Sequence, residues 1–410
     1  MSAEQSRQHH YVAQWYQKRF LPPGQAKLYY LDLKPNTVVN GAISYTVKAL
    51  RYWDPARCFC VEDLYAMKFG QRTSDAMERR FFGNVDRNGA AAADYLRAYE
   101  DIDDRANDAV LHLVNYIGAQ RFRTPRGLDW IQARIGSSDR TSTLLALQEL
   151  FQAYAAMWME GVWEIVHARE SASKFIVTDE PVTFFNRAIF PREAPYPGGE
   201  EFPKIGTRTL FPLGADACLI ITHLQLVRNP WSKPLAVRTN ARTFGRTMFK
   251  ITEIQFGREL DDNEVLRINY IMKQHATKYI AAASAEALYP EKQLGQVNWS
   301  GLDADWFLLP NPWKVGFTGG FAMGFKDDST FAMDEYGRRP WHPRYEDKKQ
   351  QDKEFRLFHD AQREWAKKRV GKPLSRVIDQ LREDSFSNTL MREYLVKEGL
   401  LPPEEPAPSA

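Results

Sequence analysis

The chain has 410 residues, of which 44% are hydrophobic and 26% are charged, and its formal net charge is +3. This composition is typical of a folded globular protein, and it excludes a disordered chain or one whose overall charge demands a polyanionic partner. The three cysteines, Cys58, Cys60 and Cys218, are too few for a disulfide framework, and no second Cys or His pair completes a metal site with Cys58 and Cys60. No apolar run approaches the roughly 20 residues of a membrane span, and the first residues lack a signal-peptide pattern. We therefore expect a cytoplasmic protein.

The N-terminal segment His9–Phe20 is rich in aromatic residues, which predicts that it docks on the core and holds its two histidines in place. Lys27–Leu33 has the pattern of a strand that ends at Lys34-Pro35-Asn36, and a second extended piece is expected near residues 57–61.

Helical spacing of apolar residues follows. It predicts one helix over residues 74–118, with a break or kink at Gly83-Asn84 and Asn88-Gly89, and another over residues 141–168. Two further helices are predicted over residues 240–255 and 262–287.

Short buried-type strands are predicted between these helices, at residues 174–178, 182–185, 209–213 and 218–223, with a Pro- and Gly-rich surface loop at 187–207. Together the elements predict an α+β domain over residues 1–287, in which long helices pack on a small, mostly antiparallel sheet.

The composition changes at about residue 288, where tryptophan and phenylalanine become frequent. We expect residues 288–398 to form an aromatic-rich appendage, with a hairpin whose turn is Lys326-Asp327-Asp328-Ser329 and a charged helix over 345–369. Its members Trp299, Trp306 and Trp313 are expected to form a small packed core. The Pro-rich, acidic residues 399–410 are predicted to be a disordered tail.

Four motifs, in this order and spacing, resemble those of domain-of-unknown-function family 4238, which is found mostly in bacteria. They are His9-His10-Tyr11-Val12-Ala13-Gln14-Trp15-Tyr16, Gln120-Arg121-Phe122-Arg123-Thr124-Pro125, Phe175-Ile176-Val177-Thr178-Asp179-Glu180-Pro181-Val182, and Phe211-Pro212-Leu213 followed by Asn269. The resemblance covers about residues 8–285, and Ala13 stands where the family has proline. It implies a fold and a set of residues, because the family carries no established activity. Either Glu78 or Asp86 stands where the family has a helical glutamate.

His10, Gln120, Arg123 and Asp179 form one candidate catalytic constellation. A histidine exchanges protons near neutral pH, an arginine binds phosphate through its planar fork, and a carboxylate orients a histidine or binds metal. This set is typical of phosphodiester hydrolysis. We therefore predict a nuclease-like hydrolase of a phosphate-bearing substrate. In it His10 is a general base or a ligand of a divalent metal ion, Asp179 is a ligand of that ion or an orienting group, and Arg123 binds the anion. Bacterial toxins and defence effectors often have cores of this size, so by analogy such a protein would be a toxin or defence effector.

Each of these residues also has a structural interpretation. Asp179 precedes Glu180-Pro181 and suits a turn, Arg123 can cap the carbonyls at a helix end, and His10 can hold the N-terminus through hydrogen bonds. His167, His223 and His275 stand alone in the pattern and are interpreted as core or surface residues.

The alternative function is a non-catalytic module that binds nucleic acid or a protein. Basic residues recur every four positions, from just before the helix predicted over 240–255 into that helix. On one helix face they would form a ridge able to bind successive phosphates of a nucleic acid. The basic residues are Arg238, Arg242, Arg246 and Lys250. A solvated helix face is the competing interpretation. The aromatic appendage would supply the protein-binding surface.

Overall fold

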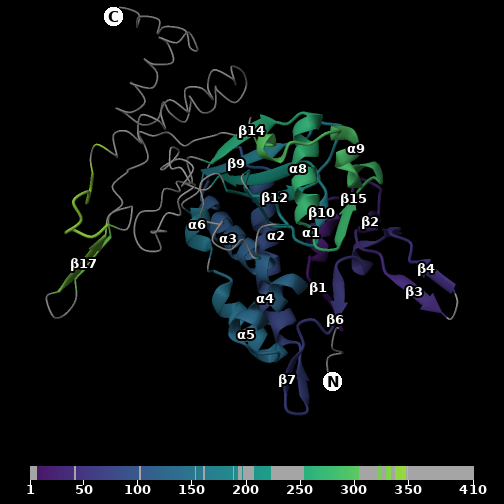
Figure 1. Ribbon diagram of the computed structural model, residues 1–410, viewed down its shortest axis with the longest axis horizontal. Coiled ribbons are helices and arrows are strands. Elements are labelled where there is room, and N and C mark those ends of the chain that lie inside the picture. The colour runs from purple at the N-terminus through teal and green to yellow at the C-terminus, as the bar shows by residue number, and fades with distance from the viewer. Residues whose placement is uncertain are drawn as a thin grey trace, which may run out of the picture.

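The computed structural model describes residues 7–40, 43–100, 103–152, 154–159, 162–187, 189–192, 196, 207–222, 254–303, 321–324, 329–333, 338–347 and 349. Within them the fold is α+β (Figure 1). The helices are α1 (Gln14–Lys18), α2 (Gly83–Arg97), α3 (Ala106–Phe122), α4 (Pro125–Ile135), α5 (Arg140–Leu150), α6 (Ala155–Met159), α8 (Asp262–His275) and α9 (Pro290–Leu294).

The largest sheet has the strand order β11-β12-β13-β9-β14. Its strands are β9 (Val162–His167), β11 (Thr183–Phe185), β12 (Arg208–Gly214), β13 (Ala217–Thr222) and β14 (Gln255–Glu259). All neighbours are antiparallel except β9 and β14, which are parallel. Strands β12 and β13 are buried along their whole length, as their continuous apolar runs predict.

A second, fully antiparallel sheet has the order β10-β15-β2-β5. Its strands are β2 (Leu28–Asp32), β5 (Leu50–Trp53), β10 (Val177–Thr178) and β15 (Tyr279–Ala282). Two-stranded pairs complete the described elements: β1 (Gln8–His10) with β6 (Cys60–Glu62), β3 (Thr37–Asn40) with β4 (Ile43–Thr46), β7 (Met67–Phe69) with β8 (Arg72–Ser74), and β16 (Phe321–Gly324) with β17 (Thr330–Met333).

The N-terminal segment docks on the core, as its aromatic residues predict. Tyr16 and Phe20 are fully buried, and the Tyr16 hydroxyl donates a hydrogen bond to the carbonyl of Pro212 on β12 at 2.7 Å. His9 is buried as well, and its Nδ1 accepts the backbone N–H of Tyr65 at 2.8 Å. The segment therefore joins the helical layer to the largest sheet.

The predicted helix over 74–118 is wrong as a single helix. The type of helix changes at Gly83, where a break or kink is predicted, but α2 continues through Asn88 and Gly89. A π-helical segment, Met77–Phe82, runs directly into α2, and the chain then breaks between α2 and α3. Glu100 follows α2, where its charge opposes the negative helix end, and Asp103 and Asp104 precede α3, where their charges favour a new N-terminus. Gly89 does not break α2: a Cβ there would lie 2.5 Å from the Tyr116 ring, so the glycine permits close packing of α2 on α3.

Two other helix predictions extend too far. Residues 141–168 form α5, α6 and then strand β9, because the β-branched residues of β9 pair with β13 on one side and β14 on the other. The helix predicted over 262–287 ends at His275, and residues 279–282 form β15 instead.

The first described residues after position 287 pack against the core. Leu288 and Leu302 are buried in the main hydrophobic cluster, and the Trp299 indole packs on Phe185 and Phe190. The predicted hairpin is confirmed by the pairing of β16 with β17. Trp306, Trp313, most of the charged helix and the tail lie outside the described residues, as do the helix over 240–255 and its Arg238, Arg242, Arg246 and Lys250. In the described part of the chain, no helix combines the length and apolarity needed to cross a membrane.

Candidate functional site

Arg123 and Gln120, two of the predicted site residues, are in direct contact at the end of α3. The Arg123 Nε donates to Gln120 Oε1 at 2.7 Å, and its Nη1 donates to Asp86 Oδ1 on α2 at 2.7 Å. Gln120 Nε2 in turn donates to the carbonyl of Tyr11 at 2.8 Å. Arg123 is 1% exposed. The pair therefore joins α2, α3 and the N-terminal segment from inside the protein.

His10 lies at the edge of this Arg123 cluster, half-buried on β1. Its Nε2 donates to the carbonyl of Ala56 at 3.1 Å. Burial lowers the pKa of His10, and the positive charge of Arg123 lowers it further, although the Ala56 hydrogen bond opposes both. The imidazole is thus neutral at neutral pH and holds the N-terminal strand, which agrees with its structural interpretation.

Both acids that could match the family glutamate face Arg123. Asp86 makes the ion pair described above. Glu78, in the π-helical segment, is partly buried, and burial raises its pKa to about 7 even though Arg123 opposes the shift. The sequence left the choice between the two open, and the structure assigns the direct contact to Asp86.

Asp179 has a different partner set from the other three predicted residues. Its carboxylate accepts three backbone N–H groups, from Thr277 at 2.9 Å, Lys278 at 2.6 Å and Tyr279 at 2.9 Å. Burial raises the pKa of Asp179 to about 6 despite these hydrogen bonds. The carboxylate therefore ties the end of α8 to the turn after β10, and the predicted constellation is divided between two anchoring sites.

His10 and Asp179 contact different partners. His10 Nε2 donates to the carbonyl of Ala56, whereas the Asp179 oxygens accept backbone N–H groups at the end of α8. Across the described ranges, no group of three or more His, Cys, Asp and Glu side chains has an arrangement that could hold a metal ion. A divalent-metal requirement stays a prediction from the sequence.

A pocket of about 680 Å³ opens beside these two anchors. None of the predicted site residues His10, Gln120, Arg123 and Asp179 lines this pocket. The described lining comes from the α3–α4 junction, the β11 region, the segment that follows β11, Thr207, the pair Leu33-Lys34 and the end of α8. Its charged and aromatic members are Lys34, Arg121, Arg126, Asp129, Phe184, Phe185, Arg192, Tyr196, Lys273 and His275.

Cations and rings alternate along one wall of the pocket. The Arg121 guanidinium lies 4.5 Å from the ring centroids of both Phe184 and Tyr196, and the Arg126 guanidinium lies 4.7 Å from the Tyr196 ring. The Tyr196 hydroxyl also donates to the Arg121 carbonyl at 2.7 Å. Such stacking holds the planar guanidinium groups in a defined orientation.

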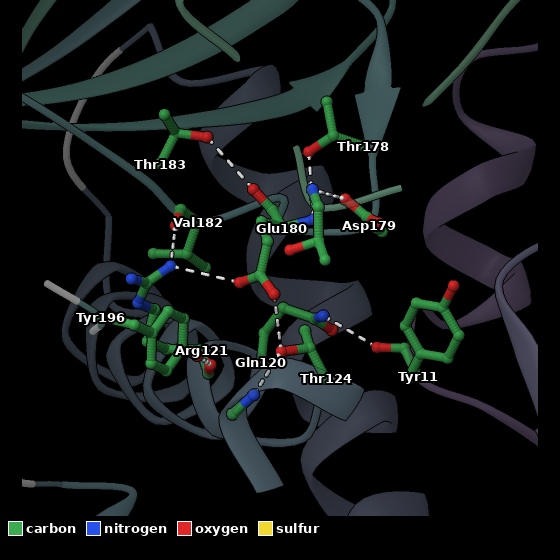
Figure 2. Close-up of polar contacts among 12 residues, drawn as sticks. Tyr11, Gln120, Arg121, Thr124, Thr178, Asp179, Glu180, Val182, Thr183 and Tyr196 are labelled. Atoms are coloured by element: carbon green, nitrogen blue, oxygen red, sulfur yellow. Dashed lines mark hydrogen bonds and ion pairs between the residues drawn. The ribbon is translucent and has the colours of Figure 1, made fainter. Parts of the chain in front are cut away.

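Glu180 lies behind this wall and contacts Arg121 directly (Figure 2). Its Oε2 accepts from Arg121 Nη1 at 3.3 Å, and its Oε1 accepts from the Thr124 hydroxyl at 2.9 Å. Burial raises the pKa of Glu180 to about 7, and Arg121 opposes the shift. Glu180 is therefore a buried counter-ion whose charge changes near neutral pH.

His275 closes the pocket at the C-terminal end of α8. Its ring packs on Trp299 at a centroid distance of 6.1 Å. Burial, together with the positive charges of Arg121 and Arg126, lowers the pKa of His275 to about 3. His275, which the sequence pattern predicts to be a core or surface residue, therefore lines the pocket as a neutral imidazole.

The predicted site residues Gln120 and Arg123 and the pocket residues Arg121 and Arg126 stand side by side in one segment of the chain. The motif Gln120–Pro125 contributes Gln120 and Arg123 to the interior, while Arg121 and the following Arg126 line the pocket. A signal was present, because Arg121 and Arg126 flank the Thr124-Pro125 helix start, where α3 ends and α4 begins.

Comparison of the chain with known proteins found no matching family model, no matching curated protein and no matching solved structure. The resemblance to family 4238 stays a prediction that rests on the motifs quoted above.

Proposed function

We propose that this protein binds a small phosphate-bearing molecule in the pocket between α4 and the end of α8. The observation that carries the proposal is the charge of the lining. Among the described lining residues Asp129 is the carboxylate, whereas the cations are Lys34, Arg121, Arg126, Arg192 and Lys273. Arg121 and Lys273 are paired with Glu180 and Glu291. Lys34, Arg126 and Arg192 form no ion pair with any described residue, so they are available to an anionic ligand.

The shape and chemistry of the wall support a phosphate-bearing ligand. Guanidinium groups bind phosphate through two parallel hydrogen bonds, and their stacking on Phe184 and Tyr196 orients them beforehand. A pocket of about 680 Å³ is in the size range of small-molecule sites, and rings among its lining residues supply apolar contact for the organic part of a ligand.

Titration of the purified protein with inorganic pyrophosphate, followed by calorimetry, tests this proposal. We expect Arg126→Gln to weaken binding about tenfold, which is the loss of one charge-assisted contact. The matched control is Arg134→Gln on the same helix, because Arg134 lies outside the pocket lining and contacts the Trp130 ring. Absence of binding by the unmodified protein, or equal losses in the two variants, would overturn the proposal.

Hydrolysis of a phosphodiester in the same pocket is the second candidate. It is favoured by His275, the histidine that lines the pocket beside the cations. Binding is the better-supported function, because an imidazole with a pKa of about 3 is far from the value at which a general base works well. Release of nitrophenolate from bis(p-nitrophenyl) phosphate, with and without divalent metal, tests the enzyme. No difference between the unmodified protein and His275→Ala would remove this candidate.

The nucleic-acid-binding ridge of Arg238, Arg242, Arg246 and Lys250 stays a sequence prediction, as does a protein partner for the aromatic C-terminal region. Reversing the charge of Arg242 and Arg246 tests the ridge: salt-dependent retention on nucleic acid would be lost if the ridge binds phosphates.

A further inference from the structure

Exposed apolar side chains gather on one β-hairpin arm, which runs from β2 to β5 (residues 28–53) and carries β3 and β4. Four of the large hydrophobic side chains that are exposed in the described part of the chain belong to this arm: Val38, Val39, Tyr45 and Tyr52. The others are spread one by one over β6, β7, α3, α4, α5 and residue 341. Val39 is 70% exposed and Tyr45 is 54% exposed. Single exposed apolar residues are normal on a protein surface, but a concentration of them marks a surface that binds a partner.

Strands β3 and β4 have free edges. Among the described strands they pair only with each other, with Val38 opposite Tyr45, so each has one edge whose backbone groups pair with no described strand. Figure 1 shows the two strands away from the helices and the largest sheet. The arm is held at its base, because the Asp32 N–H donates to the carbonyl of Ala49 at 2.9 Å next to the β2–β5 pairing. A further strand can therefore be added to a free edge without moving the body of the protein.

The two strands lack the features that keep a free edge from pairing. Natural edge strands carry lysines, prolines or bulges, which block the approach of another strand. Positions 35–47 contain no charged residue, and Pro35 stands before β3 rather than in it. The pairing of β3 with β4 also runs without a register shift. The edges are therefore suited to pairing with another strand.

The distribution of charge favours a second copy of the same arm as the partner. A strand from an acidic or basic protein would find no opposite charge on β3 or β4. Two identical strands that pair antiparallel about a two-fold axis place uncharged residues opposite uncharged residues. The charged residues nearest to β3 and β4, Lys34 and Lys48, stand at the base of the arm. Because antiparallel pairing puts the base of each arm next to the tip of the other, the lysines of the two copies stay apart.

We propose that β3 pairs edge to edge with β3 of a second copy, so that the protein forms a homodimer through this arm. The two hairpins then make one four-stranded antiparallel sheet with the order β4-β3-β3-β4. Strand β3 is the pairing strand because it carries the adjacent exposed valines Val38 and Val39, and β-branched residues are favourable in cross-strand pairs. Neither β3 nor β4 lines the pocket, so the homodimer does not depend on the proposed phosphate binding.

Sedimentation equilibrium of the full chain tests the homodimer. The apparent mass should rise with protein concentration from 47.4 kDa toward twice this value, as mass action requires. Val39→Lys places an ammonium group in the pairing strand and should raise the dissociation constant of the dimer about tenfold or more. The matched control is Leu145→Lys on α5, where the side chain is also exposed, and it should leave the dissociation constant unchanged. Circular dichroism checks that both variants are folded.

Hydrogen exchange of the unmodified protein locates the contact without any substitution. Backbone amides of β3 should exchange more slowly as the protein concentration rises, whereas those of α5 should not change. A chain that stays monomeric at every concentration would rule out a second copy as the partner. A dimer that persists in Val39→Lys, or one whose formation leaves exchange in β3 unchanged, would place the contact elsewhere and overturn the role of the arm.

Discussion

Arg123 on α3 donates a hydrogen bond to Asp86 on α2 at 2.7 Å, and the two side chains differ in exposure, at 1% and 24%. The guanidinium is surrounded by the rings of Phe82 and Tyr116, whose centroids lie 5.5 Å and 5.4 Å from it. A charge in such surroundings is tolerated only with its partner in place. The ion pair thus holds α2 against α3 at the point where the N-terminal segment joins them.

Removing the carboxylate of this pair should destabilise the protein strongly. We expect Asp86→Ala to lower the free energy of unfolding by about 3 kcal/mol, because it leaves a buried guanidinium without its counter-ion. Urea denaturation measures the change. The control is Glu62→Ala, which removes the exposed ion pair with Arg7 and should leave the urea midpoint almost unchanged. Equal effects of the two substitutions would contradict the role of Asp86.

The raised pKa of Glu78 predicts a loss of stability as the pH rises. With a pKa of about 7 in the folded protein and about 4.3 when unfolded, the folded state holds an extra proton between these values. The unfolding free energy therefore falls as the pH increases from about 4 to 7.

Glu78→Gln stays neutral, so it should match the unmodified protein at pH 4.5 and exceed its stability at pH 8 by on the order of 2 kcal/mol. Chemical denaturation at both pH values measures this difference. Glu149→Gln, on the exposed side of α5, is the matched control. A stability difference for Glu78→Gln that is the same at both pH values would refute the prediction.

Glu180 should make anion binding pH-dependent. Its pKa of about 7 means that the carboxyl loses its charge as the pH falls from 8 to 6, and Arg121 is then released from its counter-ion. Sulfate, which keeps its charge over this range, should bind several times more tightly at pH 6 than at pH 8. His275, with a pKa of about 3, does not titrate in this interval.

The test is calorimetry with sulfate at pH 6 and pH 8. Glu180→Gln should bind sulfate with the higher affinity at both values. If the pH dependence persists unchanged in Glu180→Gln, another group is responsible and this role of Glu180 is wrong.

Close packing of α3 on the end of α5 depends on Gly118. A Cβ at this position would lie 2.0 Å from the carbonyl oxygen of Phe151, which is backbone and cannot move aside as a side chain could. We expect Gly118→Ala to lower the free energy of unfolding by about 1–3 kcal/mol, as other overpacked sites do. In Gly83→Ala the nearest atom would be 3.5 Å away, so the helix propensity of alanine should raise the stability by up to about 1 kcal/mol. Thermal and urea unfolding of both variants measure these changes, and similar values for the two would contradict the packing argument.

The strands and the docked N-terminus could be predicted because their signal is local. The apolar runs that became β2, β12 and β13 favour buried strands whatever their neighbours are, and the rings of Tyr16 and Phe20 need a core. The helix ends could not be predicted in the same way. Helix α8 stops where Asp179, almost a hundred positions away, takes the backbone N–H groups of residues 277–279.

In the candidate site, too, the contacts between near neighbours in the sequence could be predicted, and the long-range contacts could not. The sequence by itself determined the α+β class and the contact of Gln120 with Arg123, because neighbours three residues apart on a helix meet without help from the rest of the chain. Only the tertiary structure decided that Asp86 pairs with Arg123, that Asp179 is an anchor, and that Arg121, Arg126 and His275 line one pocket. Each of those outcomes depends on which distant backbone and charged groups come together when the apolar surfaces are buried, and that is a property of the packed chain rather than of any one segment.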